Sequence, residues 1–129
     1  MKSLLRALIA VAAFVAVSVS SAAEIKPYDK ATFDALQAAG KPVVLHVYAD
    51  WCPTCKQQTP IIAELVAQPA FKDYTVLKVN FDTQKDLLKV LGVGTQSTLI
   101  VYRGKTEVAR TVGDTGKDSI TATLRKAAS

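Results

Sequence analysis

Apolar residues gather in short, nearly continuous runs that alternate with segments of helical spacing. Residues 43–48 are apolar almost throughout and residues 75–80 largely so, which is typical of strands covered on both faces of a sheet. Residues 98–102 and 107–110 are joined around Gly104, and this pattern predicts an antiparallel hairpin. The chain therefore supplies four strands, with 43–48 expected at the centre of the sheet.

Between and after these strands, apolar residues recur every three or four positions, as on the buried face of a helix. We expect helices over residues 29–39, from Cys52 to Val66, over 83–91 and over 116–127. Asp29 is placed to cap the first, and Thr83, followed by Asp86, has capping-box spacing at the third. This order of elements predicts an α/β fold with a mixed sheet and helices on both of its faces.

Residues 1–23 have the composition of a secretory signal peptide. Lys2 and Arg6 give a positive start, an apolar run of thirteen residues follows, and Ser21-Ala22-Ala23 supplies small residues. A spanning helix needs about 20 apolar residues, so this run is too short to be one. We expect cleavage after Ala23, export to the periplasm, and one folded domain over residues 24–129. An uncleaved N-terminal anchor is the alternative.

The charge of the expected mature domain is mild. It carries 14 basic and 11 acidic side chains, scattered along the chain. Nucleic-acid binding usually requires a clustered basic surface, so we expect no nucleic-acid partner. We expect a monomer.

The two cysteines of the chain stand three apart in Trp51-Cys52-Pro53-Thr54-Cys55-Lys56, where a strand runs into a helix. Unpaired N–H groups at a helix start favour a thiolate, so the pKa of Cys52 is expected below the roughly 8.5 of a free cysteine. A disulfide closing so short a loop adds little stability, which favours a working redox pair over a structural one. Exchange chemistry depends on Cys52 being reachable by solvent and ionised near neutrality while Cys55 stays covered.

Four features of the sequence resemble the thioredoxin family. They are Tyr48-Ala49-Asp50-Trp51-Cys52, Pro60 eight residues after Cys52, Asp82 after a strand, and Gly92 before the next strand. The likeness covers essentially all of residues 27–127, and the first motif is similar to the periplasmic thioredoxin-like domain of the bacterial membrane disulfide reductase. The resemblance implies a thioredoxin fold, a central mixed β-sheet flanked by helices on both faces.

The resemblance also implies a mechanism and its residues. Cys52 would attack a substrate and form a mixed disulfide, which Cys55 would resolve. The residues expected to contact the substrate are Trp51, Pro53, Thr54, Gln96 and Ser97. The expected substrates are protein thiols and disulfides, with a membrane-bound reductase as electron donor and no cofactor or metal.

The direction of the reaction follows less directly from the sequence. Dedicated oxidants of the family usually carry a helical insertion after the helix that follows the cysteines. Only about 20 residues separate Cys55 from the next strand, so no such insertion fits. We therefore favour reduction of protein disulfides over oxidation of thiols.

Two positions depart from the family pattern. Ser97 stands where the family has a cis-proline, and we expect the Gln96–Ser97 bond to be cis although a cis bond without proline costs about 2.5–4 kcal/mol. A trans bond with a shifted loop is the alternative.

His46 stands where the family often has a buried acid that serves the second cysteine. It is interpreted either as a catalytic proton carrier or as a neutral core residue.

A binding function competes with the redox function. Cys52 and Cys55, no longer shielded by a proline at Ser97, have the softness to hold Cu(I) or an iron–sulfur cluster shared between two chains. A redox-inert interaction module is disfavoured by the intact cysteine pair.

Overall fold

The structure is a computed structural model that describes Val15 and residues 22–128. Most of the predicted signal peptide lies outside the described residues, so its cleavage stays a prediction. Among the residues that are described, no helix has both the length and the apolar content needed to cross a membrane.

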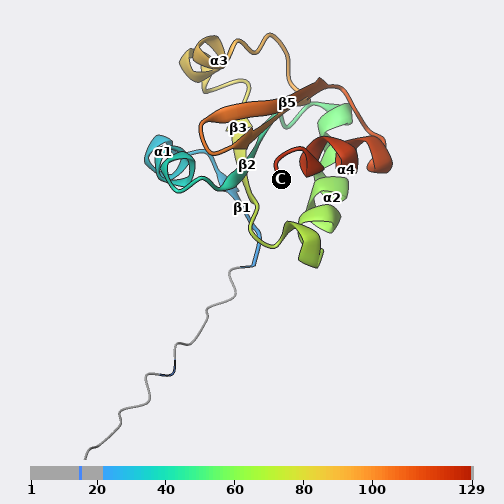
Figure 1. Ribbon diagram of the computed structural model, residues 1–129. Helices are drawn as coiled ribbons and strands as arrows, with labels where there is room; N and C mark the ends of the chain where they lie inside the picture. The colour runs from blue at the N-terminus through green and yellow to red at the C-terminus, as the bar shows by residue number, and fades with distance from the viewer. Residues whose placement is uncertain (1–14, 16–21, 129) are drawn as a thin grey trace, which may run out of the picture.

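The described chain forms five strands, four α-helices and one short 3-10 helix (Figure 1). In chain order they are β1 Glu24–Pro27, α1 Lys30–Ala38, β2 Pro42–Tyr48, α2 Pro53–Val66, η1 Pro69–Phe71, β3 Thr75–Asn80, α3 Lys85–Leu91, β4 Thr98–Arg103, β5 Thr106–Val112 and α4 Lys117–Arg125. The predicted strands and helices are all present, with bounds shifted by a few residues.

The strands form one mixed sheet in the order β1-β3-β2-β4-β5, which places β2 at the centre as predicted. β3 runs parallel to both β1 and β2, while β4 runs antiparallel to β2 and to β5. β1 was not predicted. It was missed because its sequence lacks the apolar run that marks a buried strand. The strand is only four residues long, lies at the edge of the sheet and leaves Ile25 45% exposed.

Helices cover both faces of the sheet, α1 and α3 on one side and α2 and α4 on the other (Figure 1). The central strand serves both faces because its side chains alternate. Val44 packs with the α2 and α4 side, while Val43 and Leu45 pack with the α1 and α3 side. His46 follows Val44 by two positions and therefore lies on the face that α2 covers.

The helix starts agree with the sequence in one case and differ in another. Asp29 caps α1 by accepting a hydrogen bond from the Thr32 N–H. The predicted cap at Thr83 is wrong: α3 begins at Lys85, and its cap residue Gln84 makes no side-chain capping bond. The reason is Asn80, whose Oδ1 accepts from the Thr83 N–H and holds that residue in the turn before the helix.

Candidate active site

The cysteine pair lies where the central strand passes into α2. The Cys52 N–H donates to the Ala49 carbonyl and closes the turn, and Pro53 occupies the first helical position, which needs no N–H donor. Cys52 is the N-cap of α2, and its Sγ accepts from the Cys55 N–H at 3.1 Å. The two sulfurs form a disulfide, with Cα atoms 5.3 Å apart.

Both cysteines are buried in this disulfide form. Cys52 is 1% exposed and Cys55 is 2% exposed, so the expectation that Cys52 is open to solvent is wrong here. The cause is packing from near and distant parts of the chain: the neighbouring Tyr48 and the distant Phe81 flank the pair, and the Ser97 side chain contacts both sulfurs. A partner reaches Cys52 only by displacing part of this cover.

The two sulfurs differ in their electrostatic surroundings. Cys52 Sγ faces the Cys55 N–H, a donor that stabilises negative charge. Cys55 Sγ instead lies 3.9 Å from the Val47 carbonyl oxygen, an acceptor that favours a protonated thiol. The expected division of roles, with the thiolate at Cys52 and the thiol at Cys55, therefore has a physical basis that does not require a difference in exposure.

Ser97 departs from the expectation of a cis bond. There is no cis peptide among the described residues, and Ser97 adopts a left-handed conformation with φ of 62°. That conformation costs a non-glycine residue about 1–2 kcal/mol, less than the roughly 2.5–4 kcal/mol of a cis bond without proline. It also lets the Ser97 N–H, which a proline lacks, donate to the Val47 carbonyl at 2.8 Å.

The Ser97 hydroxyl lies between the two sulfurs. Its Oγ is 3.1 Å from Cys52 Sγ and 3.1 Å from Cys55 Sγ. The neighbouring residue Gln96 is half-buried and accepts a hydrogen bond from the Thr95 hydroxyl. The loop before β4 thus brings one of its two predicted site residues directly onto the disulfide.

His46 is buried and touches the site through another side chain. Its Nε2 lies 3.0 Å from Gln58 Oε1, and within the described residues it forms no hydrogen bond to either sulfur. Burial lowers the pKa of His46 to about 4, with the charge of Lys78 acting in the same direction. The imidazole is therefore neutral near pH 7, which suits the interpretation as a neutral buried residue better than that as a proton carrier.

Gln58 is a site residue that the sequence analysis missed. It is fully buried and bonds to His46, to the Ser97 carbonyl at 3.1 Å and to the Asp114 carbonyl at 2.9 Å. A signal was present in the sequence, because Gln58 falls three after Cys55 and four before Ile62, on the inward face of α2. A polar residue at such a position requires partners.

The remaining predicted site residues lie around the rim of the pair. Trp51 is 57% exposed, and its Nε1–H donates to Asp82 Oδ2 at 2.9 Å, which fixes the indole beside the start of α2. Pro53 is exposed and Thr54 is half-buried. Their contact with a substrate stays a prediction, and their placement next to Cys52 is compatible with it.

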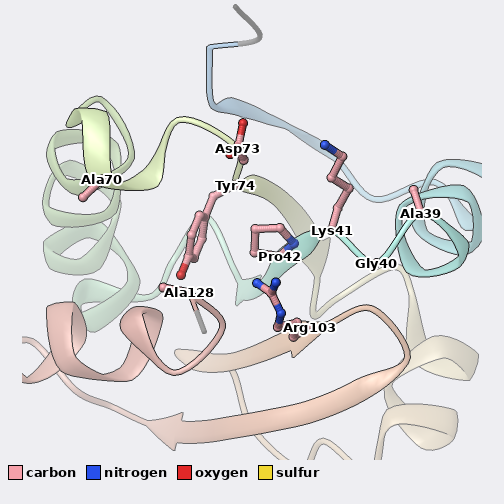
Figure 2. Close-up of a pocket in the computed structure, with 9 residues that line it drawn as sticks. All are labelled: Ala39, Gly40, Lys41, Pro42, Ala70, Asp73, Tyr74, Arg103 and Ala128. Atoms are coloured by element: carbon pink, nitrogen blue, oxygen red, sulfur yellow. The ribbon is translucent and has the colours of Figure 1, made fainter.

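Two cavities lie at opposite ends of β2. The smaller one, of about 130 Å³, reaches Cys55, and three of its lining residues are charged: Asp50, Lys56 and Lys78. A larger one of about 320 Å³ lies at the opposite end of β2, next to Pro42 (Figure 2). Arg103 reaches into that region, where it donates to the Ala127 carbonyl. The larger cavity contains none of the redox residues.

No group of three or more His, Cys, Asp or Glu side chains suited to a metal ion occurs in the part of the chain that the structure describes. Within that part, Cys52 and Cys55 would offer two ligands. The alternative of a bound soft metal or cluster would therefore need further ligands from a second chain.

Comparisons with known proteins agree with this geometry. The family model described as Thioredoxin matches residues 24–126. A thioredoxin of Chlamydia pneumoniae is 32% identical over 102 residues, covering 79% of this chain and 97% of its own length. The crystal structure of Trxlp from Edwardsiella tarda EIB202 superposes with a TM-score of 0.76 at 49% identity, covering 78% of this chain and 97% of that one. A bifunctional thioredoxin reductase/thioredoxin of Mycobacterium leprae is 29% identical over 74% of this chain, which spans 21% of that protein.

Proposed function

We propose that this chain, which belongs to the thioredoxin family, works outside the cytosol as a reductant of protein disulfides. Family membership and the Cys52–Cys55 pair make it a thiol–disulfide oxidoreductase. The direction of electron flow, the compartment and the electron donor are the finer parts of the proposal.

The proposed reaction transfers two electrons from the Cys52–Cys55 dithiol to a substrate disulfide. The Cys52 thiolate attacks one substrate sulfur, forming a mixed disulfide, and the other substrate sulfur leaves as a thiolate that takes up a proton. Cys55 then loses its proton and attacks Cys52 Sγ, which releases the second substrate thiol and leaves the Cys52–Cys55 disulfide. A dithiol reductant restores the starting state.

The observation that carries the proposed direction is the short connection after Cys55. The 19 residues between Cys55 and β3 are taken up by α2, η1 and their turns. No additional helical unit stands over the cysteines in this segment. A small substrate surface, with Trp51, Pro53 and Thr54 at its rim, suits a reductase or an electron relay.

Export is supported by the composition of residues 1–23 and by the place where folded structure begins. β1 starts at Glu24, directly after the expected cleavage site, and pairs with β3. An exported protein cannot draw electrons from a cytosolic donor directly, so we propose a membrane-bound dithiol reductase as its partner. The reductase joined to thioredoxin in the name of the Mycobacterium leprae protein supports a reductase partner in general terms.

The reduction potential of the Cys52–Cys55 pair, measured against glutathione, tests the direction. We expect a value near the −270 mV of a thioredoxin-type reductant; a value near −120 mV would identify an oxidant instead. Insulin reduction with dithiothreitol should be fast for the native pair and absent in Cys52→Ser. In Cys55→Ser, the mixed disulfide at Cys52 should accumulate.

The compartment is tested separately, by expressing the full chain in a bacterium and fractionating the cells. We expect the protein in the periplasmic fraction, with Glu24 as its first residue by N-terminal sequencing. Retention in the cytosol with residues 1–23 intact would overturn export without affecting the redox chemistry.

A further inference from the structure

Gln58 joins three separate parts of the fold beneath the disulfide. It projects from α2, and its partners are His46 on β2, the loop before β4 at Ser97, and the loop after β5 at Asp114. All three bonds lie between 2.9 and 3.1 Å, and the side chain is 0% exposed. Such a fully satisfied buried amide holds its neighbours in one arrangement.

The partners fix the orientation of the amide. The Ser97 and Asp114 carbonyl oxygens only accept, so both must receive N–H bonds from Gln58 Nε2. Gln58 Oε1 then faces His46, and a neutral imidazole must donate to it from Nε2–H. His46 thereby fixes the orientation of the Gln58 amide, and Gln58 holds the loop that carries Ser97.

Ser97 needs such support because its backbone conformation is unfavourable for a residue with a side chain. The Ser97 N–H donates to the Val47 carbonyl, and the Ser97 carbonyl accepts from both the Gly113 N–H and Gln58 Nε2. Among these bonds, the one from Gln58 comes from a side chain, and it helps to hold the Ser97 backbone in place. With the backbone held in place, the hydroxyl is directed at the two sulfurs.

We propose that Gln58 is a positioning residue that holds the Ser97 hydroxyl against the cysteine pair, so that this hydroxyl donates a hydrogen bond to Cys52 Sγ once the disulfide is reduced. Together with the Cys55 N–H, the Cys52 thiolate then has two donors. This inference rests on the proposed function only in assigning the attacking thiolate to Cys52. It does not depend on the direction of electron flow or on the compartment.

The test is the titration of the Cys52 thiol, followed by thiolate absorbance near 240 nm in a Cys55→Ala background so that a single thiol is observed. In that background, Ser97→Ala should lower the acid dissociation constant by about tenfold or more, because the thiolate loses one of its two hydrogen-bond donors. Gln58→Met should also lower the acid dissociation constant of the Cys52 thiol, by about threefold or more. Adding Gln58→Met to Ser97→Ala should change nothing further.

Matched controls separate positioning from general destabilisation. Gln57→Met makes the same substitution at the neighbouring, exposed position. Thr123→Val removes a buried hydroxyl that bonds within α4, away from the cysteines. Both should titrate like the parent. The charged groups of the cavity at Cys55, which are Asp50, Lys56 and Lys78, and Asp82, which binds Trp51, are the same in every variant.

Two results would overturn the inference: a Gln58→Met thiol that titrates like the parent, or an effect of Gln58→Met that persists in full when Ser97 is already alanine. If Gln58→Met does not fold, NMR of the native protein tests the Gln58 hydrogen bonds on which the proposal depends. The Gln58 side-chain amide protons should exchange with solvent much more slowly than those of Gln57, and equal exchange would contradict the proposal. A native protein whose Cys52 never forms mixed disulfides would defeat the proposed function instead.

Discussion

At the scale of single residues, the active site is shaped by a choice between two unfavourable backbone conformations at Ser97. A cis bond before serine costs more than a left-handed serine, and in the observed trans form the Ser97 N–H donates to the Val47 carbonyl. The resemblance to a family with a cis-proline pointed to the wrong choice because the shared chain path was assumed to require the same peptide isomer.

Two substitutions that both remove the hydroxyl test the left-handed conformation of Ser97. Glycine adopts a φ of 62° without the steric penalty that alanine has. We expect Ser97→Gly to be more stable than Ser97→Ala by about 1 kcal/mol in urea unfolding. Alanine being equal to or more stable than glycine would show that residue 97 has an ordinary negative φ.

His46 predicts a specific pH dependence of stability. Its pKa is about 4 when folded, against the ordinary value of 6.5 for histidine, so the unfolded chain takes up a proton between these values and the folded chain does not. The stabilisation is complete above pH 6.5 and is lost as the pH falls toward 4. The loss amounts to roughly 3 kcal/mol.

The measurement compares native protein with His46→Leu by urea unfolding from pH 7 to pH 4. Carboxyl groups titrate in both proteins and cancel in the difference. We expect the native protein to be more stable at pH 7 and its advantage to shrink by roughly 3 kcal/mol at pH 4. An advantage that does not vary with pH would place the folded pKa of His46 near its ordinary value.

The residues of the site were predictable from sequence to the extent that their role follows from local position. Cys52 and Cys55 were evident from their spacing at a strand-to-helix turn, and Cys52 Sγ has the N–H donor that its place at the helix start predicted. Cys55 is covered as expected, but the burial of Cys52 was not predictable, because the cover comes from Phe81 and Ser97, which are distant in sequence. Gln58 was overlooked because its partners also lie on other elements.

At the scale of elements, local patterns determined most of the boundaries. β2 and β3 were recognisable because continuous apolar runs leave little doubt about a buried strand, and Asp29 marked the start of α1. β1 was missed because an exposed edge strand owes its existence to pairing with β3. The start of α3 was misplaced because Asn80, outside the helix, takes up the N–H groups at the turn.

The end of α3 offers a clean test of a helix terminus. Gly92 is left-handed with φ of 65°, and an added Cβ there would meet no atom within 4 Å. The cost of Gly92→Ala is therefore purely conformational, and we expect a loss of about 1 kcal/mol in the free energy of unfolding. Gly94 also has open space around it and no left-handed φ, so Gly94→Ala should cause no such loss. Equal effects at both positions would contradict this assignment.

At the scale of the whole molecule, the sheet divides the interior into two cores that share only its backbone. Ile62, Leu124 and Ile120 belong to the core under α2 and α4, while Phe33 and Ile100 belong to the core under α1 and α3. The sequence predicted helices on both faces because β2 and β3 are apolar on both sides. The active site draws His46 and Gln58 from the α2 side of this division.

Because the sheet separates the two cores, their mutations should act independently. Ile100→Val and Ile120→Val remove one methylene each from fully buried positions on opposite faces, and each should cost about 0.5–1.5 kcal/mol in urea unfolding. The double variant should lose the sum to within about 0.5 kcal/mol. Ile62→Val with Ile120→Val is the matched pair within one core, where a shared cavity is expected to make the effects non-additive. Strong coupling across the sheet would mean that the two cores repack as one.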